Sequence, residues 1–236
     1  MAPIVRSEAT GPRLAVLNDD GLVVQEISLE REETVLGRAS ADVRFDDDES
    51  VSPQHAVLTW RDNLLCVRDL GSANGSWLFI TEPHPLAEGD LLLVGSQVIR
   101  YRVLPPRSIE VSPVPLLGDA AVVPVRDVAM LEQLRPDGSV RDVLYLSPGR
   151  SVLIGREHGD WVFPYDHTMS ARHAEVRPMA GTLAESILGA EAQDSLFTVR
   201  DMGSRNGVGL LVRGERTLRA GERLLVGRKM LRLDVS

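Results

Sequence analysis

Short apolar runs separated by polar turns dominate the chain. The runs are rich in Val and Leu and are bounded by Gly, Asp, Asn or Pro, which is the pattern of β-strands. Their recurrence at roughly 8–12 residues is typical of a β-sandwich. The pattern thus predicts an all-β fold. The expected strands cover residues 14–18, 23–29, 55–60, 64–70, 90–95 and 97–104, followed by 128–134, 143–147, 151–155, 173–178, 196–202, 222–227 and 229–235.

The polar segments between these runs occur twice along the chain. Related residues keep one of two spacings, 118 in the earlier part of each copy and 132 in the later part. A repeat that holds two registers over several anchors indicates two copies of one domain. The anchors are Gly37 and Gly155, Ser52 and Ser170, and His55 and His173 at the first spacing, then Asp69 and Asp201, Asn74 and Asn206, and Gly75 and Gly207 at the second.

The change from a spacing of 118 to one of 132 shows where the second copy is longer than the first. An insertion must lie between His173 and Asp201 in the second copy, and residues of about 178–195 are expected to form it as a grown loop, with a short helix in LAESILGAEA. We expect one domain at 12–104 and another at 124–236. The segment 105–123 between them contains four prolines and reads as a linker.

Composition narrows the possible functions. The 236 residues carry a formal net charge of −8, which argues against binding to duplex nucleic acid. Cys66 is the only cysteine, so no intramolecular disulfide can form. The N-terminus lacks the apolar core of a signal peptide, and no run reaches the length of a membrane helix. We expect a soluble, cytoplasmic protein without membrane insertion.

No residue pattern indicates catalysis or a cofactor. His158, His167 and His173 do not have the spacing of metal ligands, and no cysteine accompanies them, so no metal site is expected. The Gly37-Arg38 pair is not followed by the Gly-Lys-Ser/Thr of a phosphate-binding loop, and no nucleophile elbow or cofactor fingerprint occurs. The chain is therefore expected not to be an enzyme and to need no cofactor.

The ordered anchors resemble the motif of the forkhead-associated (FHA) domain, a β-sandwich that binds phosphothreonine peptides. That motif is Gly-Arg, then Ser-x-x-His, then a turn that ends Ser-x-Asn-Gly. The first copy has Gly37-Arg38, Ser52 with His55, and a turn from Ser72 to Gly75. The second copy has Gly155-Arg156, Ser170 with His173, and a turn from Ser204 to Gly207. The resemblance implies two tandem FHA-like sandwiches that cover most of the chain.

The resemblance also implies roles for these residues, and their chemistry suits the roles. Arginine offers a fixed charge and a rigid fork of donors for a phosphate, serine offers a hydroxyl, and asparagine can clamp a peptide main chain. The residues expected to bind the phosphopeptide are Arg38, Ser52, Ala73 and Asn74 in the first copy, and Arg156, Ser170, Arg205 and Asn206 in the second. The residues expected to be structural are Gly37, His55, Asp69 and Gly75, and Gly155, His173, Asp201 and Gly207.

Other interpretations stay open at this point. Asn-Gly is foremost a hairpin-turn signal. Arg205 and the acidic run Asp46–Glu49 suggest that the second site is the more electropositive one. The favoured function is a non-enzymatic adaptor that binds phosphothreonine proteins, among them a Ser/Thr kinase or its substrates. The alternative is a scaffold or assembly component that uses FHA-like domains without phosphate, and a regulatory fragment of a larger enzyme is less favoured.

Overall fold

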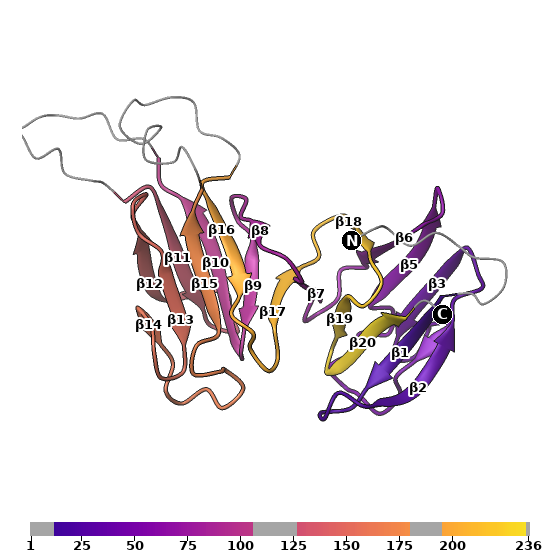
Figure 1. The fold of residues 1–236 in the computed structure, drawn as a ribbon. Coiled ribbons are helices and arrows are strands. Elements are labelled where there is room, and N and C mark those ends of the chain that lie inside the picture. Colours follow the sequence, from indigo (N-terminus) through magenta and orange to yellow (C-terminus); the bar gives the residue numbers. More distant parts are fainter. Residues whose placement is uncertain (1–11, 106–126, 180–194, 235–236) are drawn as a thin grey trace, which may run out of the picture. The chain divides into compact units, whose positions relative to one another are not determined.

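The computed structural model of the protein describes residues 12–105, 127–179 and 195–234, which form strands and turns and no helix (Figure 1). The predicted all-β fold is therefore confirmed. Apart from Pro105, the expected linker lies outside the described residues. So does the expected insertion with its short helix, except for residues 178, 179 and 195.

The strands form two compact units that do not follow the order of the repeat. The first unit is assembled from both ends of the chain, Met1–Thr81 and Gly209–Ser236, and the second is Glu82–Val208. These units differ from the contiguous domains expected at 12–104 and 124–236, because each copy contributes its last strands to the other unit. The two final segments carry the same apolar alternation, so periodicity alone allows either segment to occupy either place.

Two sheets make up the first unit. In one, the strands lie in the order β17-β7-β19-β20-β1-β2, and in the other in the order β18-β6-β5-β3-β4. The strands are β1 (Arg13–Leu17), β2 (Val23–Ser28), β3 (Glu33–Gly37), β4 (Val43–Arg44), β5 (Ala56–Arg61), β6 (Leu64–Asp69), β7 (Ser76–Phe79), β17 (Val208–Leu211), β18 (Glu215–Leu218), β19 (Arg223–Val226) and β20 (Lys229–Asp234).

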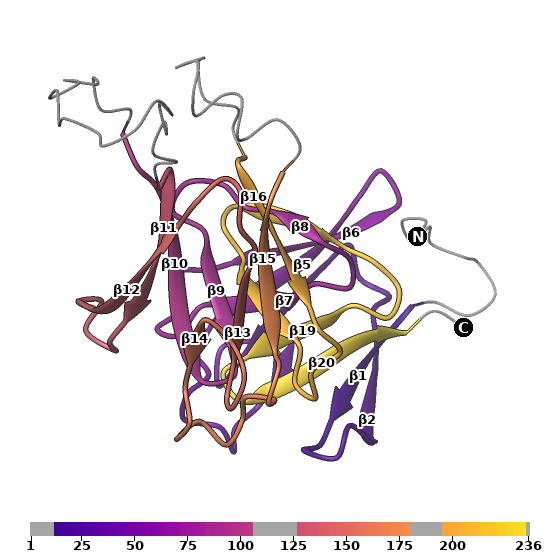
Figure 2. The same cartoon turned by 60° about the vertical axis from the view of Figure 1, so that its left-hand side comes forward.

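The core of the first unit joins the two ends of the chain. Strand β20 runs antiparallel to β1, with Leu233 opposite Leu14, and the two strands lie side by side in Figure 2. Leu224 and Val226 of β19 are buried in the same hydrophobic cluster as Leu58 of β5. Burial of apolar surface is the main source of stability in such a sandwich. The C-terminal strands are therefore integral to this unit.

The second unit has the same plan. Its sheets run β12-β11-β10-β9 and β14-β13-β15-β16-β8. Tyr101 of β10 is fully buried opposite Leu131 of β11, and its ring meets that of Phe197 edge-on at 6.3 Å between centroids. The strands are β8 (His84–Pro85), β9 (Leu91–Val94), β10 (Gln97–Val103), β11 (Ala129–Leu134), β12 (Val140–Leu146), β13 (Val152–Gly155), β14 (Trp161–Val162), β15 (Ala174–Pro178) and β16 (Phe197–Asp201).

A buried carboxylate ties the loop after β4 to the turn between β19 and β20. Asp48 accepts hydrogen bonds from the N–H (3.0 Å) and hydroxyl (2.6 Å) of Ser50, and from the N–H (2.8 Å) and Nε (3.3 Å) of Arg228. Burial raises the pKa of Asp48, but these donors outweigh it and lower the pKa to about 2. The folded protein therefore stabilises the ionised form of Asp48 over the protonated form.

Acid should destabilise the first unit through this carboxylate. In the unfolded chain an Asp has a pKa of about 3.9. Between this pH and the folded pKa of about 2, Asp48 is protonated in the unfolded chain and ionised in the folded one. The contribution of Asp48 to stability is present above pH 4 and is lost as the pH falls toward 2. In Asp48→Asn, the free energy of unfolding should be lower at pH 6 and should depend less on pH in this window. Thermal melts followed by circular dichroism test this, with the exposed Asp46→Asn as the control that should keep the wild-type slope.

Candidate functional site

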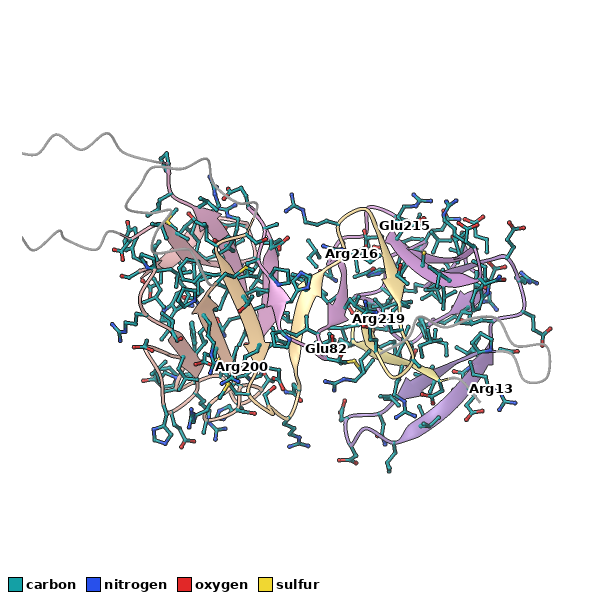
Figure 3. The ribbon with its side chains drawn as sticks, turned by 45° about the horizontal axis from the view of Figure 1, so that its top comes forward. Arg13, Glu82, Arg200, Glu215, Arg216 and Arg219 are labelled. Carbon is teal, nitrogen blue, oxygen red and sulfur yellow. The ribbon has the colours of Figure 1, made fainter. Side chains whose placement is uncertain are left out.

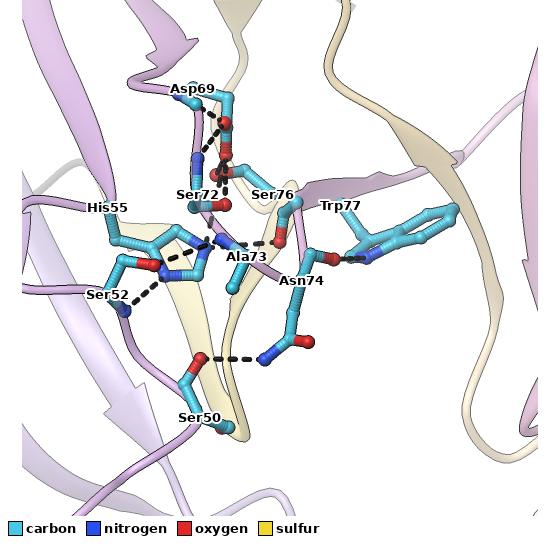
Figure 4. Close-up of polar contacts among 11 residues, drawn as sticks. Ser50, Ser52, His55, Asp69, Ser72, Ala73, Asn74, Ser76 and Trp77 are labelled. Carbon is cyan, nitrogen blue, oxygen red and sulfur yellow. Dashed lines mark hydrogen bonds and ion pairs between the residues drawn. The ribbon is translucent and has the colours of Figure 1, made fainter. Parts of the chain in front are cut away.

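The polar loops expected to form the first site meet in the structure (Figure 4). The hydroxyl of Ser52 accepts a hydrogen bond from the N–H of Ala73 at 3.0 Å. The side-chain amide of Asn74 donates to the carbonyl of Ser50 at 2.8 Å. The Ser52 hydroxyl thus keeps its own proton for a ligand oxygen, and the Asn74 amide keeps a second N–H and its carbonyl oxygen for a peptide main chain.

Arg38 reaches the same place from the end of β3. Its backbone N–H donates to the carbonyl of Ser52 at 2.9 Å, so the arginine and the serine lie on hydrogen-bonded segments. The Nε atom of Arg38 is buried and has no hydrogen-bond partner within the described residues. A buried donor without a partner is costly, and a ligand that accepts from it would remove that cost. Within the described residues, the guanidinium of Arg38 therefore keeps one donor, the buried Nε, that no other residue uses.

A buried histidine sets the geometry of the first site. His55 is completely inaccessible to solvent. Its Nδ1 accepts the N–H of Ser52 at 3.1 Å, and because Nδ1 is the acceptor, Nε2 carries the proton and donates to the carbonyl of Gly75 at 3.1 Å. The ring thus connects the serine loop with the asparagine turn. Both of its nitrogens are used in these hydrogen bonds, so neither is available for catalysis or for a metal.

Asp69 holds the turn that carries Asn74. Its carboxylate accepts the N–H groups of Gly71 (2.9 Å) and Ser72 (2.8 Å) and the hydroxyls of Ser72 (2.8 Å) and Ser76 (2.7 Å). Burial raises the pKa of Asp69, but the donors from Ser76 and Ser72 outweigh it and leave the pKa below its ordinary value. The carboxylate therefore acts as an ionised template for the loop.

Two glycines are required by close packing around the first site. A side chain at Gly37 would place its Cβ 2.3 Å from the carbonyl oxygen of Pro53. Gly75 has a φ of +72°, and a Cβ there would lie 2.4 Å from the side chain of Leu211. The left-handed backbone at Gly75 favours glycine, and at Gly37 the fixed backbone of Pro53 leaves no room for a Cβ.

The second copy reproduces this arrangement. The hydroxyl of Ser170 accepts the N–H of Arg205 at 3.0 Å, and Asn206 donates to the carbonyl of Thr168 at 2.7 Å. The N–H of Arg156 donates to the carbonyl of Ser170 at 2.9 Å. His173 again joins the two loops, because its Nδ1 accepts the N–H of Ser170 at 3.0 Å and its Nε2 lies 2.9 Å from the carbonyl of Gly207. Asp201 accepts the N–H groups of Gly203 (3.0 Å) and Ser204 (3.1 Å). Gly155 lies against the carbonyl of Ala171, where a Cβ would be 2.2 Å away.

The two sites differ most at the arginine. In the second copy both Nε (3.2 Å) and Nη2 (2.7 Å) of Arg156 donate to the carboxylate of Glu157. The residue after Arg38 is Ala39, which has no charge to offer. The phosphate-facing cation is thus paired in the second copy, which the sequence reasoning did not anticipate although Glu157 is adjacent to Arg156 in the chain.

The acidic run near the first site is also partly neutralised. Asp48 is paired with Arg228, and Lys229 donates to Asp47 at 2.6 Å. Arg228 and Lys229 lie some 180 residues from these carboxylates in the sequence, so sequence spacing gave no signal of the contact. Together with the Arg156–Glu157 pair, these contacts remove much of the charge difference expected in favour of the second site.

Within residues 12–105, 127–179 and 195–234, no group of three or more His, Cys, Asp or Glu side chains could hold a metal ion. No helix in this part of the chain is long and apolar enough to cross a membrane. The arrangement offers hydrogen-bond donors around a cation, which is a recognition surface for an anion on a peptide.

Replacing the buried histidine should destabilise the first unit. His55→Leu would leave the Ser52 N–H and the Gly75 carbonyl buried without partners, at about 1–3 kcal/mol each. The melting temperature should therefore fall clearly. His158→Leu is the control, since the side chain of His158 is exposed. Equal melting temperatures for His55→Leu and the wild type would contradict the bridging role.

Comparison with known proteins agrees with the repeat. The model of the FHA domain family matches residues 34–95 and 152–227, more than half of the chain. Among curated proteins no match is found.

Solved structures that resemble the chain each correspond to less than half of it. The FhaA FHA domain complexed with the intracellular domain of Rv3910 is 26% identical over 34% of this chain and 88% of that one, with a TM-score of 0.26. An FHA domain from a study of phosphothreonine-dependent interactions is 26% identical over 40% of this chain and 97% of that one, again with a TM-score of 0.26. The FHA domain of CT664 from Chlamydia trachomatis is 21% identical over 45% of this chain and 96% of that one, also with a TM-score of 0.26.

Proposed function

We propose, because the chain belongs to the FHA domain family, that its two sites bind phosphothreonine peptides and that it acts as a non-enzymatic adaptor in Ser/Thr kinase signalling. Its partners would be phosphothreonine proteins, such as a Ser/Thr kinase or its substrates. The proposed setting is the cytoplasm, which suits a protein whose single cysteine, Cys66, is free and buried.

One observation supports this function above the others. In each copy an arginine, a serine hydroxyl and an asparagine amide lie on loops that hydrogen-bond to one another. A phosphate carries roughly −1.5 to −2 charges and several acceptor oxygens. We expect such a phosphate to accept from the guanidinium of Arg38 and from the hydroxyl of Ser52, since the backbone N–H of Arg38 is bonded to the Ser52 carbonyl and the two residues lie on adjoining segments. A peptide without the phosphate would lack this acceptor.

The second site also suits the alternative function. Arg156 is already bound to Glu157, so a phosphate must compete with a carboxylate for the guanidinium. A scaffold that binds protein surfaces without phosphate would not need this arginine free. The two functions are distinguished by pull-downs from lysate treated or untreated with phosphatase. Phosphatase should abolish binding by the proposed adaptor and leave that of the scaffold unchanged.

Removing the first arginine should weaken phosphopeptide binding. A charge-assisted hydrogen bond is worth about 1.5–3 kcal/mol, so Arg38→Ala should lose roughly tenfold to a hundredfold in affinity at the first site. The loss is measured by calorimetric titration of the full chain with a phosphothreonine peptide, in the Arg156→Ala background that isolates the first site. The unphosphorylated peptide is the control. An unchanged affinity would mean that the first copy has no phosphate site.

Releasing the second arginine should strengthen the second site. In Glu157→Ala, the guanidinium of Arg156 no longer has a neighbouring carboxylate, and affinity for the same peptide should rise about twofold to fivefold. The measurement uses the Arg38→Ala background. The reciprocal variant, Ala39→Glu in the Arg156→Ala background, should lower the affinity of the first site. No response to either change would show that the carboxylate does not compete with the ligand.

A further inference from the structure

The final segments of the two copies are exchanged between the units. Residues 82–104 complete the second unit and residues 209–236 complete the first, although the repeat assigns them the opposite way. We propose that this exchange is selected by charge, and that Arg228, a residue of the second copy, is a positioning residue of the first site. The part of the proposal that concerns peptide binding rests on the proposed function, whereas the exchange itself does not.

The repeat shows which residues of one copy are equivalent to which residues of the other, and so which turn could occupy the same position in each unit. At the spacing of 132, Arg228 and Lys229 correspond to Ser96 and Gln97. The loops that receive them correspond at the spacing of 118, where Asp46–Glu49 of the first copy matches residues 164–167 of the second. The first loop has four carboxylates, and the second has only Asp166. The two turns and the two loops are thus strongly unequal in charge.

The exchanged arrangement joins the cationic turn to the acidic loop. In the first unit Arg228 binds Asp48 and Lys229 binds Asp47. In the second unit Asp166 accepts the N–H of Ser96, the hydroxyl of Ser96 and the side-chain amide of Gln97, each at 2.8 Å. A neutral turn therefore meets the loop that has one carboxylate.

Contiguous domains would lose part of this complementarity. Lys229 would then face Tyr165, the counterpart of Asp47, which has no charge and is 92% exposed. Ser96 and Gln97 would face the run of four carboxylates without a cation. One ion pair, between Arg228 and Asp166, could then form in place of the two that are now present, Arg228–Asp48 and Lys229–Asp47. Opposite charges in contact stabilise and like charges repel, so the exchanged pairing is the favoured one.

A second contact, at strand β18, favours the same pairing. Glu215 at the start of β18 accepts from Nε of Arg61 at 2.9 Å, and Figure 3 labels Glu215 on this strand. The counterparts of the two residues in the repeat are Pro83 and Met179. Contiguous domains would place Arg61 near Pro83 and Glu215 near Met179. Exposed ion pairs contribute little each, and Arg228 and Asp47 are exposed as well, so the preference rests on several pairs that all favour the same arrangement.

The exchanged turn supports the loop that forms the first site. Gly227 packs so closely on this loop that a Cβ would lie 2.5 Å from the side chain of Val51. Arg228 fixes Asp48, and Asp48 fixes Ser50, whose carbonyl holds Asn74. Ser52 follows directly after Val51 in the chain. Arg228 therefore acts on the first site through Asp48, and Ser96 acts on the second site through Asp166.

The native cysteine offers a direct test of the exchange in the full chain. Cys66 of β6 is opposite Thr217 of β18, with 4.0 Å between Sγ and Oγ1. In Thr217→Cys, oxidation by diamide should join the two thiols in an intramolecular disulfide, because the side-chain atoms Sγ of Cys66 and Oγ1 of Thr217 already lie in contact across the two strands. The matched variant is Pro85→Cys, since Pro85 is the counterpart of Thr217 in the repeat and is opposite Thr198 in the structure. It should stay reduced.

Peptide mapping and non-reducing gels decide between the arrangements. A monomer with Cys66 linked to residue 217 is the expected result for Thr217→Cys. A disulfide in Pro85→Cys instead would show contiguous domains and overturn the proposal. A disulfide-linked dimer of Thr217→Cys would show exchange between chains, which also overturns it. A Thr217→Cys variant that stays reduced would count against the observed pairing.

Charge reversal tests the role of Arg228 at the first site. In Arg228→Glu a carboxylate would lie against Asp48, and affinity for a phosphothreonine peptide should fall roughly tenfold at the first site, measured in the Arg156→Ala background. At the second site, measured in the Arg38→Ala background, Ser96→Glu should have the corresponding effect through Asp166. Arg219→Glu, on the exchanged segment but exposed, is the control for the change in net charge.

Which of the two sites loses affinity in each variant shows which part of the proposal fails. Contiguous domains would reverse the pattern, so that Arg228→Glu weakens the second site and Ser96→Glu the first. Equal losses at the first site for Arg228→Glu and Arg219→Glu would show that net charge alone matters, and would overturn the positioning role. If the wild type binds no phosphothreonine peptide, the proposed function fails, while the disulfide test still decides the exchange.

Discussion

A carboxylate that is buried away from water must accept hydrogen bonds, and this constraint organises both units of the structure. Asp48 and Asp166 each sit in the loop before the site serine, and each is satisfied partly by its own loop and partly by a turn from the other copy. These hydrogen bonds fix the conformation of the loop and also bind the turn between the last two strands of the unit. The position of Ser52 and Ser170 thus depends on donors that are remote in the sequence.

The conserved plan of the two sites conceals a difference in how their charges are used. In the first site the Nε of Arg38 has no partner among the residues that the structure describes, and Arg228 and Lys229 compensate the acidic loop. The second site pairs its arginine with Glu157. Similar backbone geometry is therefore combined with different electrostatics, because hydrogen bonds within the loops fix the shape while the exposed charges around them are free to vary.

The sequence was sufficient for the features that local patterns determine. Alternating apolar residues gave the strands, and the repeated Ser-x-x-His and Ser-x-Asn-Gly segments identified the loops that the structure brings together at Ser52 and Asn74. It could not give the pairing of the final strands, because residues 82–104 and 209–236 share one pattern and fit the same place. It could not give the neighbours of Asp48 either, since contacts across some 180 residues have no local signature.

The exchange has a consequence for the stability of the two sites. The ladder between β1 and β20 and the ladder between β10 and β11 each join strands of different copies. Residues 209–236 complete the sandwich that holds Ser52, and residues 82–104 belong to the sandwich that holds Ser170. Neither copy therefore contains all the strands of the sandwich around its own site. A substitution in the last strands of one copy acts on the stability of the unit that holds the other copy's site.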